Sequence, residues 1–128
     1  MLEERLREIV RDRGILEGLK ALIKELVEKF NPKSVIIAGS LAEGKFVRGL
    51  SDIDILVVVD KVSDEERFHL KAVEDVNVEI TVVALDELRE AIKGGNEFYR
   101  RSLRGIEIYG NLAEVLKRKL LEEEAYVN

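Results

Sequence analysis

Residues 38–55 read AGSLAEGKFVRGLSDIDI, and this stretch decides the fold. Gly39 and Ser40 follow one apolar run, and after a spacer of eleven residues Asp52 and Asp54 stand at the head of a second one. Residues two apart in a strand point to the same face of the sheet. Two carboxylates at roughly 4 Å repel by about 4 kcal/mol at an effective dielectric constant near 20. Because this repulsion is unfavourable for folding, we expect the two carboxylates to have a function.

Length and composition limit the classes of protein to which the chain can belong. The 128 residues are 46% hydrophobic and 37% charged, which is typical of one globular domain spanning residues 1–128. The net charge of −5 argues against nucleic acid as the main partner. No apolar run approaches the roughly 20 residues that a membrane-spanning helix needs, and no signal segment opens the chain. We therefore expect a soluble cytoplasmic protein with no membrane partner.

The side chains available for metal binding are also restricted. The chain has no cysteine and a single histidine, so thiolate and histidine-rich metal sites are excluded. A bound metal would have to be held by oxygen atoms, which favours Mg²⁺ or a similar hard cation.

Helices and strands are expected to alternate along the chain. Helical periodicity over residues 2–30 ends at Asn31-Pro32, and Gly14 and Gly18 can bend or break that helix. The pattern of Ser63 to Glu66 predicts a capping box that opens a helix. The expected strands are 34–38, 52–59, 77–83 and 106–109, and the other expected helices are 41–47, 63–72, 86–94, 96–103 and one that begins at 111. This order predicts an α/β (α+β) fold with a mixed sheet of about four strands flanked by helices.

A third carboxylate lies within the predicted strand 77–83. Glu79 shares a face of that strand with Asn77 and Thr81, and it would approach Asp52 and Asp54 if the two strands pair. Two divalent cations about 3.5–4 Å apart could neutralise such a cluster, activate an attacking oxygen and stabilise a leaving group. The sequence therefore predicts a catalytic metal site at these three carboxylates.

The glycine-serine pair is suited to binding phosphate. Gly39 lets the backbone approach a phosphate closely, and Ser40 at a helix start offers a hydroxyl and amide donors. We therefore expect both residues to bind the phosphates of a nucleotide.

Gly39-Ser40, the spacer and Asp52-Ile53-Asp54-Ile55 together resemble the signature of the nucleotidyltransferase superfamily, which has a polymerase-beta-like fold. The resemblance implies that Asp52 and Asp54 bind two Mg²⁺ ions, for which Mn²⁺ can substitute. It further implies that Glu79 completes one metal site and activates the acceptor hydroxyl.

More narrowly, the chain resembles the minimal nucleotidyltransferases that are encoded beside HEPN toxins. The likeness lies in Ser40–Gly44, in Leu50–Asp54 and in the stretch Phe98–Gly110, which ends in Gly105-Ile-Glu-Ile-Tyr-Gly110. It implies an antitoxin that transfers AMP from ATP, or the nucleotide of another NTP, to a tyrosine of a HEPN-type toxin encoded nearby.

The chain departs from that family in the loop after Gly39-Ser40. Many members carry arginines there, where this chain has Leu41 and Glu43. Lys45 and Arg48 are the nearest cations and are predicted to bind nucleotide, with a solvated surface as the alternative. A basic cluster, residues 99–104, could meet nucleotide or partner, but a solvated surface is the favoured interpretation.

Two other functions remain open from the sequence. The chain could transfer a nucleotide to a small hydroxylated molecule, or it could neutralise a partner by contact alone without catalysis.

Overall fold

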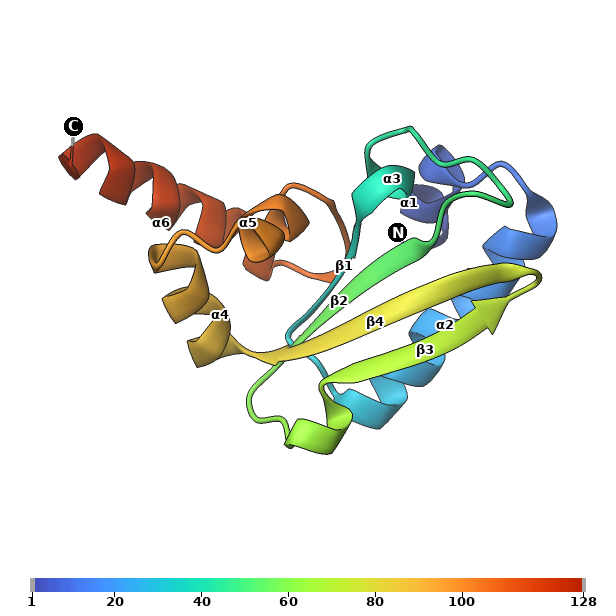
Figure 1. The fold of residues 1–128 in the computed structure, drawn as a ribbon, viewed down its shortest axis with the longest axis horizontal. Coiled ribbons are helices and arrows are strands. Elements are labelled where there is room, and N and C mark those ends of the chain that lie inside the picture. Colours follow the sequence, from blue (N-terminus) through green and yellow to red (C-terminus); the bar gives the residue numbers. More distant parts are fainter. Residues whose placement is uncertain (1, 128) are drawn as a thin grey trace.

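The computed structural model describes the backbone of residues 2–127 and the side chains of residues 4–119. The sheet is mixed, with strand order β3-β4-β2-β1-β5 (Figure 1). Its strands are β1 (Ser34–Ala38), β2 (Ile53–Val59), β3 (Phe68–Val73), β4 (Val76–Ala84) and β5 (Ile106–Gly110). The α-helices are α1 (Leu2–Ile9), α2 (Arg13–Phe30), α3 (Gly39–Ala42), α4 (Leu85–Lys93), α5 (Glu97–Leu103) and α6 (Leu112–Val127). The predicted fold class is therefore confirmed, with one strand more than expected.

The additional strand is β3, where the sequence pattern had predicted a helix over residues 63–72. The capping box of Ser63 and Glu66 does form, but it opens only a single 3-10 turn, Asp64–Glu66. The chain then pairs antiparallel with β4 through a two-residue turn between Val73 and Val76. The predicted helix does not continue beyond this turn, because residues 68–73 form a ladder of backbone hydrogen bonds with the neighbouring strand β4.

Some helix boundaries also differ from the expectation. The first helix breaks before Gly14, because Asp12 caps α2 by accepting a hydrogen bond from the Ile15 amide at 3.0 Å, and Gly14 and Gly18 lie inside α2. Helix α3 begins at Gly39 and ends at Ala42, so the expected helix 41–47 is wrong in position and length.

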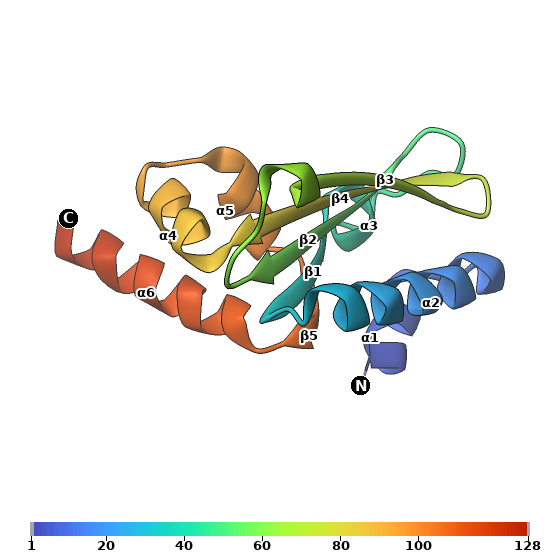
Figure 2. The ribbon, with the colours of Figure 1, turned by 90° about the horizontal axis from the view of Figure 1, so that it is seen from below.

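Part of the described chain lies on each face of the sheet. On β2, Ile53, Ile55 and Val57 face a core that includes residues of α1 and α2. Leu56 and Val58 face a second core with α4, α5 and the first turns of α6. Figures 1 and 2 show these two helical groups at different ends of the molecule. Asp54 is the second residue of β2, and its side chain points to the same face of the sheet as that of Leu56.

No helix in the part of the chain that the structure describes combines the length and the apolar character needed to cross a membrane.

Candidate active site

The turn from β1 into α3 requires glycine at its first position. Gly39 has a φ of 67°, in the left-handed region that side chains disfavour. A Cβ atom at this residue would lie 2.3 Å from Oδ2 of Asp54. The turn and the Asp54 carboxylate are therefore in direct contact, and a larger residue at position 39 would have to displace that carboxylate.

The pairing of β2 with β4 places two of the predicted carboxylates together. The strands run parallel, and Asp54 is the register partner of Glu79. Register partners in adjacent strands have side chains on the same face. The two carboxyl groups share a hydrogen bond, and both residues are partly buried. The strand pairing that the sequence prediction had to assume is thus present in the structure.

This proximity changes the acidity of Asp54. Burial raises the pKa of the Asp54 carboxyl from its ordinary 3.8 to about 6, and the hydrogen bond and charge of Glu79 and the charge of Asp52 add to the rise. The guanidinium of Arg101 opposes it. In the metal-free protein the pair therefore holds a proton under mildly acidic conditions, where isolated carboxyl groups are ionised.

Asp52 is placed differently from the expectation. The strand begins at Ile53, so Asp52 precedes β2 and is exposed. Across the side chains described, residues 4–119, no three histidine, cysteine or acidic groups form a cluster that could hold a metal ion as it stands. The structure thus brings together Asp54 and Glu79, with Asp52 near enough for its charge to act on Asp54.

The donor chemistry at this position nevertheless fits a divalent cation. Asp54 and Glu79 offer adjacent oxygen ligands, and because burial and Glu79 raise the pKa of Asp54 to about 6, a proton relieves their repulsion only below about that pH. A nearby cation favours the ionised form of a carboxyl group, so it could take over the role of that proton. Asp52 would supply a further oxygen donor from the residue just before β2.

Of the predicted phosphate-binding residues, Gly39, Ser40 and Lys45 lie at or just after the same turn, whereas the Arg48 side chain has other partners. Ser40 is partly buried in α3, and Lys45 is exposed just beyond that helix. Arg48 is bound instead by two carboxylates, with contacts of 2.5 Å to Asp12 and 2.8 Å to Asp75.

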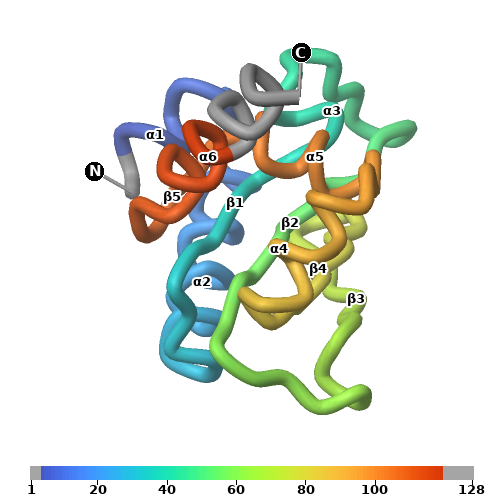
Figure 3. The backbone as a smooth tube through the Cα atoms, turned by 90° about the vertical axis from the view of Figure 1, so that its left-hand side faces the viewer, coloured from blue at the N-terminus to red at the C-terminus, as the bar shows by residue number. Residues whose placement is uncertain are grey.

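A further arginine reaches this turn from a distant part of the chain. Arg101 in α5 donates from Nε and Nη2 to the two carboxylate oxygens of Glu43, at 2.7 and 3.0 Å. Figure 3 shows that α5 and α3 both lie near the end of β1 that leads into the Gly39 turn. The sequence marks Arg101 as part of a basic cluster, but nothing in the local pattern links it to Glu43.

Apolar side chains lie exposed on the sheet next to the carboxylates. Leu70 of β3 is the register partner of Glu79, and Phe68 is the partner of Thr81. Both therefore share the face of Glu79, and they are 66% and 54% exposed. This uncovered apolar strip therefore lies on the sheet face that carries the Glu79 carboxylate.

Comparison with known proteins agrees with this geometry. Among curated proteins, no match to the chain was found. The family model described as "Nucleotidyltransferase domain" matches residues 19–120, a range that includes the Gly39 turn, both strands of the carboxylate pair and α5. Proteins with this domain generally use divalent metals and a nucleoside triphosphate. The chain therefore belongs to the nucleotidyltransferase domain family.

Proposed function

We propose that this nucleotidyltransferase moves a nucleoside monophosphate, AMP from ATP, to a hydroxyl group of a partner protein. The single observation that carries the proposal is the Asp54–Glu79 pair in direct contact with the Gly39 turn. A pair of partly buried like charges disfavours folding unless a proton or a cation neutralises it. Binding of Mg²⁺, with Mn²⁺ as a substitute, would relieve the repulsion at the position where phosphates would enter.

Each residue then has a separate role. Asp52 and Asp54 are proposed to bind two metal ions, with Glu79 completing one of the sites. Bound divalent cations would supply charge neutralisation for the phosphates and the leaving group. Gly39 and Ser40 are proposed to hold the phosphates through backbone and hydroxyl groups.

The proposed reaction is a displacement at the α-phosphorus. A bond forms from the acceptor oxygen to this phosphorus, the bond from phosphorus to the bridging oxygen of the β-phosphate breaks, and pyrophosphate leaves. The proton of the acceptor hydroxyl goes to Glu79, whose carboxylate lies on the open face of β4. Lys45 remains a predicted nucleotide ligand, as does Arg48, whose present partners are Asp12 and Asp75.

Two observations favour a protein as the acceptor over a small molecule. Phe68 and Leu70 form an exposed apolar strip on the face of Glu79. Contiguous exposed apolar surface is a common feature of sites that bind another macromolecule. The resemblance to minimal nucleotidyltransferases encoded beside HEPN toxins points to such a toxin as the partner, and to an antitoxin role for this chain.

Incubation of the chain with a nucleoside triphosphate, Mg²⁺ and the product of the neighbouring gene tests the proposal. Mass spectrometry should show a nucleoside monophosphate added to the partner, and the added mass identifies the base. Modification of small hydroxylated compounds but not of the partner would favour the small-molecule reaction. Neutralisation of the partner without any modification would favour action by contact alone.

A further inference from the structure

Helix α5 is held tightly against the strand that leads into the Gly39 turn. A Cβ atom at Gly105, just after α5, would lie 2.2 Å from the carbonyl oxygen of Ile37 and 3.1 Å from Cα of Ala38. Ala38 is the residue immediately before Gly39, so the end of α5 is fixed to the backbone that forms the turn. Such close packing is possible only because position 105 carries no side chain.

Because α5 packs in this way, the positively charged side chain of Arg101 lies near the proposed phosphate site. Arg101 lies one helical turn before Gly105, and its guanidinium grips Glu43 with two hydrogen bonds. Glu43 is the C-cap residue of α3, the helix that begins at Gly39. The charge of Arg101 is also close enough to Asp54 to influence that carboxyl group.

The ion pair between Arg101 and Glu43 can exchange partners. The Arg101 side chain is 62% exposed, and exposed ion pairs are weak because water screens the charges. The fork of a guanidinium matches the oxygens of a phosphate as well as those of a carboxylate. A triphosphate near Gly39 would bring more negative charge than the one carboxylate of Glu43.

We infer that Arg101 is a ligand of the nucleotide triphosphate, and that Glu43 holds its guanidinium in place until the nucleotide enters. The inference rests on the proposed function, because it assumes that the phosphates bind at the Gly39 turn. Arg101 and Glu43 then act in opposite directions: the arginine attracts the phosphates, whereas the glutamate competes with them.

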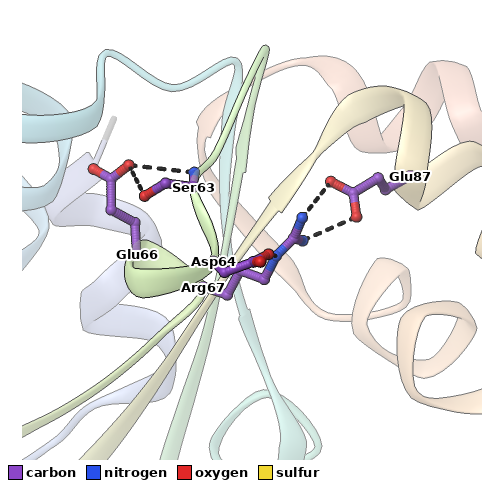
Figure 4. Close-up of polar contacts among 5 residues, drawn as sticks. All are labelled: Ser63, Asp64, Glu66, Arg67 and Glu87. Atoms are coloured by element: carbon purple, nitrogen blue, oxygen red, sulfur yellow. Dashed lines mark hydrogen bonds and ion pairs between the residues drawn. The ribbon is translucent and has the colours of Figure 1, made fainter.

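A second arginine-glutamate pair provides a matched control. Arg67 donates to both carboxylate oxygens of Glu87 at 2.9 and 3.1 Å and also contacts Asp64 (Figure 4). This pair is bidentate like the Arg101–Glu43 pair, although Arg67 uses Nη1 and Nη2 where Arg101 uses Nε and Nη2. It lies where β4 leads into α4, away from the Gly39 turn.

The test is calorimetric titration of Arg101→Gln, Glu43→Gln and Arg67→Gln with a nucleotide that cannot be cleaved. Wild-type chain is first titrated with the four α,β-methylene nucleoside triphosphates in Mg²⁺, and the tightest binder is used. Arg101→Gln should weaken binding by roughly 10- to 100-fold, the scale of a lost hydrogen bond to a charged group. Glu43→Gln should leave the affinity unchanged or raise it a few-fold, and Arg67→Gln should leave it unchanged.

Thermal unfolding of the nucleotide-free variants checks that each of them folds. An Arg101→Gln variant that folds and binds as tightly as Arg67→Gln would overturn the inference and leave the proposed function standing. Equal weakening by Arg101→Gln and Glu43→Gln would also overturn it, because the pair would then support only the shape of the turn. Absence of binding by the wild-type chain to all four nucleotides would overturn the proposed function and this inference together.

Discussion

The two ends of the β2–β4 ladder hold opposite kinds of charge pair. At the end where β4 leads into α4, Arg67 is bound by carboxylates of Asp64 and Glu87 (Figure 4). At the other end, Asp54 and Glu79 are register partners with the same charge, and burial raises the pKa of Asp54 to about 6. In the first arrangement the guanidinium of Arg67 has carboxylate partners from within the chain. The second leaves two like charges close together, and a proton relieves their repulsion only below about pH 6.

We therefore expect the charges at the Arg67 end to contribute to stability, and those at the Asp54 end to contribute to activity. Removing a partner at the Arg67 end takes away an attraction, so the folded state should lose a little stability and no activity. Removing a carboxylate at the Asp54 end takes away a repulsion, so the metal-free fold should lose nothing while activity is lost. The predictions below test whether the two ends respond in this opposite way.

The largest effect is expected for Asp54→Asn. The amide keeps the size of the side chain but removes one of the proposed metal ligands, so nucleotidyl transfer should be abolished. The melting temperature of the metal-free protein should stay the same or rise, because the repulsion with Glu79 is relieved. Transfer measured by mass spectrometry and thermal unfolding in a chelator check both parts.

Glu87→Gln is the control for that variant at the opposite end. It weakens the grip on Arg67 and should leave transfer at the wild-type rate. A loss of transfer equal to that of Asp54→Asn would mean that the two ends do not differ in function.

Glu79→Gln should separate catalysis from binding. Nucleotide binding should largely survive, whereas transfer should fall by roughly 10²–10⁴-fold, the usual scale for general-base assistance. Calorimetry and mass shift on one preparation measure the two quantities.

The same variant also distinguishes an adenylylating antitoxin from one that acts by contact. Its ability to neutralise the partner should be lost with transfer while partner binding is retained. Full neutralisation by a Glu79→Gln protein that cannot transfer would contradict the adenylylation mechanism.

A smaller effect is expected at the glycine turn, where the chain contains its own control. Gly39 and Gly44 both have a positive φ, of 67° and 75°, but an added Cβ meets Asp54 only at position 39 and meets nothing within 4 Å at position 44. Alanine at either position should cost roughly 1–2 kcal/mol of stability from backbone strain. Gly39→Ala should in addition weaken binding of an ATP analogue in Mg²⁺, as measured by calorimetry. Equal affinity in both variants would make the turn a simple connector.

The smallest expected effect is a pH dependence of the metal-free fold. Because the folded state raises the pKa of Asp54 from 3.8 to about 6, it binds this proton more tightly than the unfolded chain does. The resulting stabilisation is complete below about pH 3.8 and is lost as the pH rises through about 6. Urea unfolding of the wild type between pH 5 and 7 should therefore show falling stability, and Asp54→Asn should show a flatter profile. Parallel profiles for the two proteins would remove Asp54 as the source.

The carboxylate pair could be predicted from the sequence because its signals are local. The alternation of apolar residues around Asp54 and Glu79 gives the face of each strand, and only the pairing of the two strands had to be assumed. Asp52 was placed within the strand, whereas β2 begins at Ile53, since strand ends are set by hydrogen bonds to neighbours that the local pattern does not contain.

The features that sequence reasoning missed depend on contacts between distant segments. Residues 68–73 carry a helix signal from the preceding capping box and become a strand because β4 lies alongside. The link of Arg101 to Glu43 spans 58 residues and exists because Gly105 packs on the end of β1. The partners of Arg48, Asp12 and Asp75, lie 36 and 27 residues away in the sequence, so the ion pairs of Arg48 could not be predicted from the loop alone.

The most direct test of the central claim is the effect of a divalent cation on thermal unfolding. Wild-type protein and the double variant Asp52→Asn/Asp54→Asn are unfolded in a chelator and in increasing Mn²⁺. A ligand that binds only the folded state stabilises it, by about 2.7 kcal/mol at a hundred times its Kd. The melting temperature of the wild type should rise with Mn²⁺, and that of the double variant should stay constant. An equal rise in both proteins would show that these aspartates do not hold the metal.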